Sequence, residues 1–355
     1  MVKILGLNIG GANTKYALLS VENNQLKLLT SGSEYFPFWK KLQSFPSFLA
    51  ELKEKLKELH GNITQVVFVT TAELADCFQT KKEGIQSICD SVLEVFYSEG
   101  SNMPLILDVN GDYIPVDIAS ENWLSVAATN WVASAKYFAK DNVNAIVIDI
   151  GSTTTDIIPI FNGEIVAEGK NDLERLISKE LVYVGLIRTN VVAIIQEIKL
   201  NNKIIPLASE LFATSGDVYL ILNMISEDEF TSDTADGKPA DKKHAMVRLS
   251  HIICADTNQL AQGEIIAIAK QVKDKQLEQL SIALNVVADR YREKYSINPK
   301  FVLIGAGATT LGISLLRMNG IYEEVIANDI LGDEKLNVFC AFAVAAIYQQ
   351  LHMTK

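Results

Sequence analysis

Two short stretches combine a glycine turn with side chains suited to phosphate chemistry. In the first, NIGGANTK, an apolar strand carries Asn8 to its carboxyl end. Gly10 and Gly11 let the turn bring backbone N–H groups close to an anion. Thr14 adds a hydroxyl donor, and Lys15 adds a positive charge. We predict that this stretch binds phosphate; a plain glycine turn with surface side chains is the alternative.

The second stretch is DIGSTTTD, which begins at Asp149 after the most apolar strand of the chain, NAIVIDI. Burying a carboxylate there is costly unless a cation or hydrogen bonds compensate, and Mg²⁺ bound through waters would do so. We predict Asp149 and Asp156 as metal ligands. The predicted phosphate-binding residues between them are Gly151, Ser152, Thr153, Thr154 and Thr155. The alternative is a threonine-rich hairpin.

A third glycine turn follows the strand FVLI and contains Gly305 and Gly307. We add both to the predicted phosphate-binding residues, although an isolated GxG usually reflects close packing of a strand on a helix. Thr310 occupies the position of a third glycine, which disfavours a Rossmann dinucleotide site.

Charged residues near expected element ends supply further candidates. Glu73 and Asp76 follow the strand QVVFVTT and can bind a cation or accept a proton; capping a helix is their alternative role. Arg188 follows a glycine at an expected helix start and can clamp a phosphate or carboxylate with two hydrogen bonds. A surface salt bridge is the alternative for Arg188.

Polar residues inside apolar helical stretches form another group of candidates. Glu210 and Asp217, with Arg248 and Asp256, either form a buried ion network or line an acceptor pocket. Asn130 is a further candidate for substrate binding. The four histidines show no metal-ligand spacing, and His251 receives no role. We expect the three tryptophans to be packing residues.

Strands and helices alternate in a pattern that restarts after about 140 residues. Strands are expected at residues 2–9, 15–20, 25–30, 65–71 and 104–109, and helices at 45–60, 82–96 and 120–139. A second strand, glycine turn and hairpin then occupy 144–169. Helical stretches follow at 189–198, 210–226, 244–272 and 273–295, then a strand at 301–308 and a helix at 334–350; residues 227–243 read as an exposed loop. The restart indicates two related units.

The repeat predicts a duplicated α/β fold with two lobes. Residues 1–140 would form the N-terminal lobe, with a closing helix at 334–355 packing back on it. Residues 141–333 would form the C-terminal lobe, with a helical insertion at about 189–295 and the GAG turn.

Composition limits the class of protein. The chain has 355 residues, is 48% hydrophobic and 21% charged, and carries a net charge of −11. These values fit a globular protein and argue against nucleic-acid binding. The four cysteines form no CxxC pair, which suits reduced thiols. No apolar run reaches membrane-spanning length, and the first residues read as a strand, so we expect a cytoplasmic protein without a membrane partner.

The three glycine turns occur in the order found in the actin-like ATPase (ribonuclease H-like) superfamily, which the chain resembles. There they are the phosphate-1 loop, the phosphate-2 loop and a glycine loop beside the nucleoside. The resemblance implies two lobes with a central cleft that holds the ligand. One departure is Asn8, where the superfamily usually has aspartate. A neutral amide holds Mg²⁺–ATP less well, so ATP is not expected to be required.

Further stretches resemble a narrower family: TTAELADCF, SENWLSVAATNW, YVGLIRT, ASELFATSGDVYLIL, TADGKPADKKHA and RLSHIICAD. They are similar to the hydantoinase/oxoprolinase-related proteins of tetrahydromethanopterin-linked one-carbon metabolism, which include an enzyme of methanofuran biosynthesis. The resemblance runs nearly from end to end, from Asn8 to Gly307.

This resemblance implies a transferase that forms an aryl ether and releases diphosphate. An aminomethylfuran-methyl diphosphate would be the electrophile, and the phenol of γ-glutamyltyramine the nucleophile, with Mg²⁺ assisting. The implied catalytic residues are Lys15, Asp149, Arg188 and Glu73, and the substrate-binding residues are Asp76, Asn130, Glu210 and Asp217. An ATP-dependent kinase or hydantoinase/oxoprolinase-type hydrolase, and a non-enzymatic nucleotide-binding regulator, stay open as alternatives. The partners would be small molecules, and the oligomeric state is left open.

Overall fold

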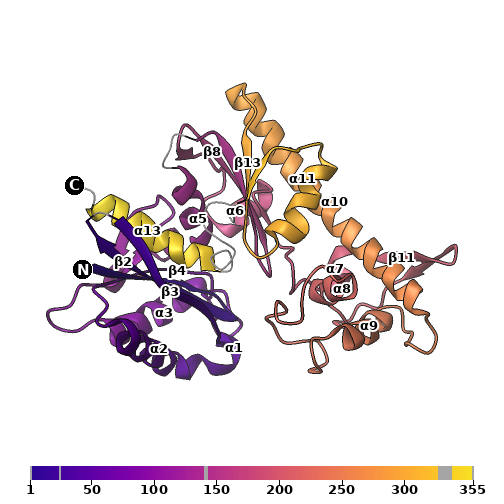
Figure 1. Cartoon of the computed structure of the whole chain (residues 1–355), viewed down its shortest axis with the longest axis horizontal. Coiled ribbons are helices and arrows are strands. Elements are labelled where there is room, and N and C mark those ends of the chain that lie inside the picture. Colours follow the sequence, from indigo (N-terminus) through magenta and orange to yellow (C-terminus); the bar gives the residue numbers. More distant parts are fainter. Residues whose placement is uncertain (1, 24, 140–142, 327–337, 354–355) are drawn as a thin grey trace. The chain divides into compact units, whose positions relative to one another are not determined.

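The computed structural model describes residues 2–23, 25–139, 143–326 and 338–353, which form two compact units (Figure 1). Unit 1 comprises Met1–Asn144, Ile160–Arg175 and Asn328–Lys355, and unit 2 comprises Ala145–Pro159 and Leu176–Ala327. The predicted boundary differs from this division, because residues 160–175 belong with unit 1. Of the predicted closing helix, residues 334–337 and 354–355 lie outside the described residues.

Unit 1 is built on a six-stranded sheet in the order β3-β2-β1-β4-β5-β6. Its strands are β1 (Val2–Ile9), β2 (Asn13–Glu22), β3 (Gln25–Tyr35), β4 (Gln65–Thr70), β5 (Leu105–Leu107) and β6 (Tyr113–Pro115). The first three form the predicted antiparallel meander, and β4 then pairs with β1 in parallel. The carboxyl ends of β1 and β4 therefore lie side by side, with Ile9 opposite Thr70.

Helices cover both faces of this sheet (Figure 1). On one side lie α2 (Phe45–His60) and α3 (Lys81–Phe96), whose apolar residues join those of the sheet in a core rich in phenylalanine. On the other side lies α13 (Phe339–Met353), which packs on β1, β2, β4 and on α5 (Asn130–Ala139). The approach of α13 is so close that a Cβ on Gly6 would overlap the carbonyl of Ala341. Shorter elements are α1 (Phe38–Lys41), α4 (Trp123–Val126), β9 (Glu164–Ile165) and α6 (Asp172–Ile177).

The second sheet has the order β10-β8-β7-β13-β14, and β9 also pairs with β8. The strands are β7 (Ala145–Ile150), β8 (Thr155–Phe161), β10 (Leu181–Val182), β13 (Lys300–Ile304) and β14 (Glu324–Ile326). β7 pairs in parallel with β13, as β1 pairs with β4 in the first sheet. On the other side of β7, strands β8 and β10 pair antiparallel, as β2 and β3 do. The repeated order confirms the predicted duplicated α/β fold.

The rest of unit 2 is mostly helical. Its elements are α7 (Val191–Ile194), β11 (Glu197–Leu200), β12 (Lys203–Pro206), α8 (Ser215–Ile221), α9 (Lys242–His251), α10 (Gln262–Tyr295) and α11 (Ile313–Met318). The longest, α10, packs against α7, α8, α9 and α11. Its buried face follows helical spacing and consists almost entirely of apolar residues.

Several helices predicted from the sequence were wrong in extent. The helix at 120–139 is broken, because Ala128 adopts a left-handed conformation (φ 51°) between α4 and α5. The helix at 189–198 is a single turn followed by a β-hairpin, and the one at 210–226 is limited to α8. The break predicted near residue 272 lies instead between α9 and α10, where Cys254 has φ 55°.

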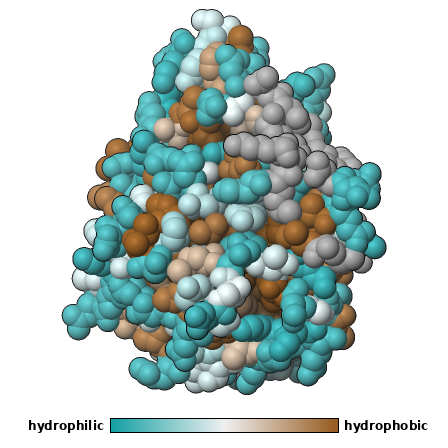
Figure 2. Space-filling view, turned by 90° about the vertical axis from the view of Figure 1, so that its left-hand side faces the viewer, coloured by the Kyte–Doolittle hydropathy of each residue, from teal (hydrophilic) through white to brown (hydrophobic). Residues whose placement is uncertain are grey.

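The surface is mixed in character. In the view of Figure 2, apolar residues are scattered among hydrophilic ones. Among the described residues, no helix combines the length and apolar character needed to cross a membrane. The four cysteines are free thiols.

Candidate phosphate-binding loops

The first glycine turn, here called loop 1 (residues 10–13), joins β1 to β2. The N–H of Gly10 donates to the carbonyl of Asn13 at 2.9 Å, which closes the turn. The carbonyl of Gly11 accepts from the N–H of Phe38 at 3.0 Å, and that of Ala12 accepts from the N–H of Phe36 at 2.9 Å. In the described part of the chain, the N–H groups of Gly11 and Ala12 donate to no protein acceptor. The carbonyl dipoles of loop 1 therefore point into the protein, and these two N–H groups are left for a ligand.

The second turn, loop 2 (residues 151–154), joins β7 to β8 with the same closing bond. The N–H of Gly151 donates to the carbonyl of Thr154 at 2.8 Å. The carbonyl of Gly151 accepts from the N–H of Leu186 at 2.9 Å. The carbonyl of Ser152 accepts from the N–H groups of Ile187 and Arg188, both at 2.9 Å. These donors belong to residues 184–189, here called the bracing segment.

Loop 2 consequently presents three consecutive N–H groups. Those of Ser152, Thr153 and Thr154 donate to no protein acceptor within the described residues. Successive N–H groups in a turn form a concave site for anions. The side chains of these residues are half-buried and bring three hydroxyls. The hydroxyl of Thr155, in contrast, is fully buried and donates to the carbonyl of Val184 at 2.8 Å, so it serves the fold.

Pairing of β1 with β2 separates the polar residues around loop 1. Asn8 lies opposite Lys15, and Ile9 lies opposite Thr14. Residues opposite one another share a face of the sheet, and successive residues of a strand point to opposite faces. Asn8 and Lys15 therefore share one face, and Thr14 lies on the other. Thr14 is fully buried on the face of the phenylalanine-rich core. The sequence therefore brings together Asn8 and Lys15, but not Thr14 and Lys15.

Asp149 lies at the end of β7, where the third glycine turn packs against it. Gly305 has a left-handed backbone (φ +85°), and a Cβ there would overlap the carboxylate of Asp149. Gly307 donates its N–H to the carbonyl of Ile150 at 2.9 Å. Gly305 thus makes room for a carboxylate at this strand end. Asp156 is buried on β8, opposite Leu181.

Glu73 is the most unusual carboxyl group of unit 1. It follows β4, its backbone lies against Gly84 of α3, it is only 1% exposed, and its Oε2 has no hydrogen-bond partner in the described chain. Burial raises the pKa of Glu73 to about 7, against the opposing effect of Lys81. Lys81 itself pairs with Asp172 at 3.0 Å. Asp76, in contrast, is exposed.

The other predicted substrate-binding residues are dispersed. Asn130 begins α5, and Glu210 is exposed. Asp217 is fully buried: Arg248 Nε donates to its Oδ1 at 2.8 Å, and its Oδ2 caps α8 through the N–H of Thr214. This buried ion pair corresponds to the network alternative. Arg188 is exposed at the end of the bracing segment.

Sequence reasoning missed the bracing segment as part of the site. Apart from Arg188, the stretch YVGLIRT is predicted to matter only as a family resemblance, although its backbone holds loop 2. Gly185 lies against loop 2 so closely that a Cβ would come within 2.6 Å of the backbone of Thr153. A glycine between apolar residues was the available signal, because close backbone contact demands glycine.

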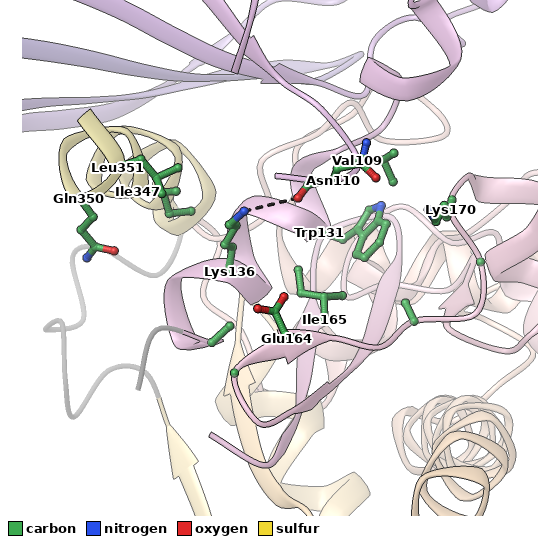
Figure 3. A pocket seen from close by; sticks show the side chains of 14 residues that line it. Val109, Asn110, Trp131, Lys136, Glu164, Ile165, Lys170, Ile347, Gln350 and Leu351 are labelled. Atoms are coloured by element: carbon green, nitrogen blue, oxygen red, sulfur yellow. Dashed lines mark hydrogen bonds between the residues drawn. The ribbon is translucent and has the colours of Figure 1, made fainter. Parts of the chain in front are cut away.

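A separate cavity of about 390 Å³ lies within unit 1 (Figure 3). It is lined by residues of α5, β9, α13 and the turn after β5. Lys136 Nζ, on its wall, donates to the carbonyl of Gly111 at 3.0 Å. Trp131 also lines it and stacks on the guanidinium of Arg175, 4.1 Å from the ring centre, as a packing residue would. None of the predicted site residues lines this cavity.

The residues around loop 2 fit Mg²⁺ with a single protein carboxylate. No group of three or more metal-binding side chains was found among the described residues. Mg²⁺ is often held by one or two carboxylates plus waters and substrate phosphates. Asp149 meets this requirement, and Gly305 provides the space that its carboxylate occupies.

Comparisons with known proteins agree with the sequence resemblance. A relative from Methanocaldococcus jannaschii is 38% identical over 353 residues, covering 98% of both chains. A second, from Methanococcus vannielii, is 39% identical over 179 residues, covering 49% of this chain and 77% of the relative. Both carry the name (4-{4-[2-(γ-L-glutamylamino)ethyl]phenoxymethyl}furan-2-yl)methanamine synthase.

Fold similarity extends further than sequence similarity. Nucleotide-free acetone carboxylase superposes with a TM-score of 0.50 at 11% identity, covering 97% of this chain and 70% of that one. The duplicated sheets give the chain the actin-like ATPase fold. The profile of the Hydantoinase/oxoprolinase family matches residues 64–348, and the chain belongs to this family.

Proposed function

We propose that this protein forms the aryl ether of a methanofuran precursor. The phenol oxygen of γ-glutamyltyramine would replace diphosphate on the methylene carbon of an aminomethylfuran-methyl diphosphate. One C–O bond to diphosphate breaks, one C–O bond to the phenol forms, and the phenolic proton is lost. The observation that carries this proposal is 38% identity across 98% of both this chain and the synthase from M. jannaschii.

Loop 2 suits the departure of diphosphate. A furylmethyl cation is delocalised into its ring, so stabilising the leaving group is the main requirement for catalysis. We assign the N–H groups and hydroxyls of residues 152–154 to the diphosphate oxygens. Lys15, next to loop 1, is our candidate for a phosphate contact within unit 1. Mg²⁺ at Asp149 would supply positive charge to the departing diphosphate.

Glu73 is our candidate for accepting the phenolic proton. A general base works best when its pKa lies near the operating pH, and burial brings the pKa of Glu73 to about 7. Binding the ammonium of the aminomethyl group is the second role that its charge allows. We expect the reaction to run in the cytoplasm, with no requirement for ATP.

The test is incubation of the purified protein with the furan diphosphate, γ-glutamyltyramine and Mg²⁺, with and without ATP. Mass spectrometry would follow the ether, and a phosphate assay would follow the diphosphate. We expect equal amounts of ether and diphosphate without ATP. Ether formation only with ATP, or ATP hydrolysis without ether, would overturn the proposal in favour of an ATP-dependent enzyme of the same fold.

A further inference from the structure

A chain of buried polar groups connects the long helix α10 to loop 2. Gln276 is fully buried on the mostly apolar core face of α10, between Val272 and Leu280. Its amide nitrogen donates to the carbonyl of Gly185 at 2.8 Å, across 91 residues of sequence. Its amide oxygen accepts from the hydroxyl of Tyr219 at 2.9 Å. A buried polar side chain is costly unless hydrogen-bonded, and both ends of this one are.

The Gly185 peptide is held from several directions. Its carbonyl also accepts from the hydroxyl of Ser215 at 3.0 Å, and its N–H donates to the hydroxyl of Thr189 at 2.9 Å. The N–H of Thr189 donates in turn to Ser215 at 3.2 Å. All these groups are buried in unit 2. A fully connected buried network of this kind fixes one arrangement of the backbone.

The carbonyl of Gly185 determines which way the amide of Gln276 points. A carbonyl oxygen only accepts, so it must face the amide nitrogen, and the amide oxygen then faces Tyr219. Burial raises the pKa of Tyr219 far above its ordinary value, so the phenol keeps its proton and donates to that oxygen. Reversing the amide would put its oxygen against the carbonyl of Gly185.

Gly185 transmits this order to loop 2 by direct contact. Its α-carbon lies against the peptide between Ser152 and Thr153. The residues on either side of it, Val184 and Leu186, bond the loop at Thr155 and Gly151. The bracing segment therefore determines where the N–H groups of loop 2 point.

We infer that Gln276 is a positioning residue for diphosphate: through Gly185 it holds the N–H groups of loop 2 in the arrangement that binds the leaving group. This inference rests on the proposed function, since it assumes that loop 2 holds diphosphate. The role predicts an effect on diphosphate affinity in the folded protein, beyond any effect on stability. Buried anion-binding groups act best when they are fixed in advance.

The experiment measures binding of inorganic diphosphate with Mg²⁺ by calorimetry, together with thermal stability and ether formation. Gln276→Leu keeps a side chain of similar size but removes both hydrogen bonds. We expect diphosphate affinity to fall on the order of tenfold, as for loss of a buried hydrogen bond. The KM for the phenol should not change. Gln271→Leu is the matched control, because Gln271 lies on the same helix and bonds Lys199 of the β11–β12 hairpin instead.

Gln276→Glu adds a test by pH. A buried glutamic acid can donate its proton to the Gly185 carbonyl while it is neutral, but a carboxylate cannot donate. Affinity for diphosphate in this variant should approach that of wild type at low pH and fall as pH rises, relative to wild type at each pH. A purely structural role would lower the melting temperature and leave the affinity of the folded protein unchanged.

The outcomes separate the two claims. Wild-type diphosphate affinity in folded Gln276→Leu overturns the positioning role, whether or not the protein makes the ether. Failure of wild type to bind diphosphate overturns it as well. Diphosphate binding that depends on Gln276 in a protein that forms no ether supports the positioning role and removes the proposed reaction.

Discussion

Loops 1 and 2 occupy equivalent places in the two units and differ in their chemistry. Aligning NIGGANTK with DIGSTTTD pairs Asn8 with Asp149 and Lys15 with Asp156. Both turns close with an N–H-to-carbonyl bond over three residues, at 2.9 and 2.8 Å. In both, later backbone N–H groups bond the loop carbonyls. The shared backbone pattern exposes N–H groups in both loops, and the two loops differ in the charge of the side chains next to those groups.

The difference lies in the source of positive charge. Loop 1 is followed by a lysine and preceded by a neutral amide, so it brings its own cation to an anion. Loop 2 lies between two carboxylates, Asp149 and Asp156, which would repel an anion unless a metal ion were present. Under the proposed function, the same backbone turn would bind an anion with a metal ion in loop 2 and with a lysine in loop 1, depending on the residue at the strand end.

Asp149→Asn gives the largest expected effect, because it converts the strand end of loop 2 into that of loop 1. Without the carboxylate, the proposed Mg²⁺ would lose its protein ligand, and we expect ether formation to fall by roughly 100-fold or more. Steady-state kinetics across Mg²⁺ concentrations would measure the loss. The amide is similar in size, so the melting temperature should change little. Unchanged turnover would show that loop 2 does not depend on a metal held by Asp149.

Glu73→Gln tests a buried carboxyl group of unit 1, as Asp149→Asn tests a carboxylate at a strand end of unit 2. The raised pKa of about 7 means that the folded protein binds a proton here more tightly than the unfolded chain, whose carboxyl group has a pKa of 4.5. The stabilising contribution is complete below pH 4.5 and is lost as pH rises towards 7. In wild type, this titration lowers the free energy of unfolding by up to about 3 kcal/mol between pH 4.5 and pH 7. Urea unfolding at several pH values should show that the amide substitution removes this slope; an unchanged slope would assign it to another group.

Gly185→Ala tests whether loop 2 depends on the close contact between Gly185 of the bracing segment and its own backbone. The new Cβ would lie 2.6 Å from the backbone of Thr153, so the loop must shift. We expect diphosphate affinity to fall about tenfold, as for a lost charge-assisted hydrogen bond. Gly263→Ala is the control, because a Cβ there meets nothing within 4 Å. Equal affinities in the two variants would show that the contact does not position the loop.

Local pattern predicted the elements that carry the loops better than it predicted the site. The helix at 45–60 was confirmed residue for residue as α2, because a proline near its start and Gly61 after its end mark both limits. The repeated strand order was foreseeable from the two apolar strands that end in glycine turns. Both features depend on neighbours in sequence.

What the sequence did not reveal depends on distant partners. Thr14 and Thr155 look like ligand donors because each lies next to a glycine turn, yet the sheet buries both. Gln276 looks like any glutamine of a polar helix until its partner, 91 residues away, is known. Side-chain direction in a strand changes with each residue, so a motif of adjacent residues cannot all face one ligand.

Gly11→Ser gives the smallest expected effect and sharpens the comparison most directly. It places in loop 1 the hydroxyl that loop 2 carries at Ser152. A Cβ at Gly11 meets nothing within 4 Å, and its backbone is not left-handed, so the fold should accept the change. One added neutral hydrogen bond to phosphate should tighten diphosphate binding about threefold. Calorimetry would detect this change, whereas unchanged affinity would mean that loop 1 does not contact the diphosphate and that its lysine serves another part of the substrate.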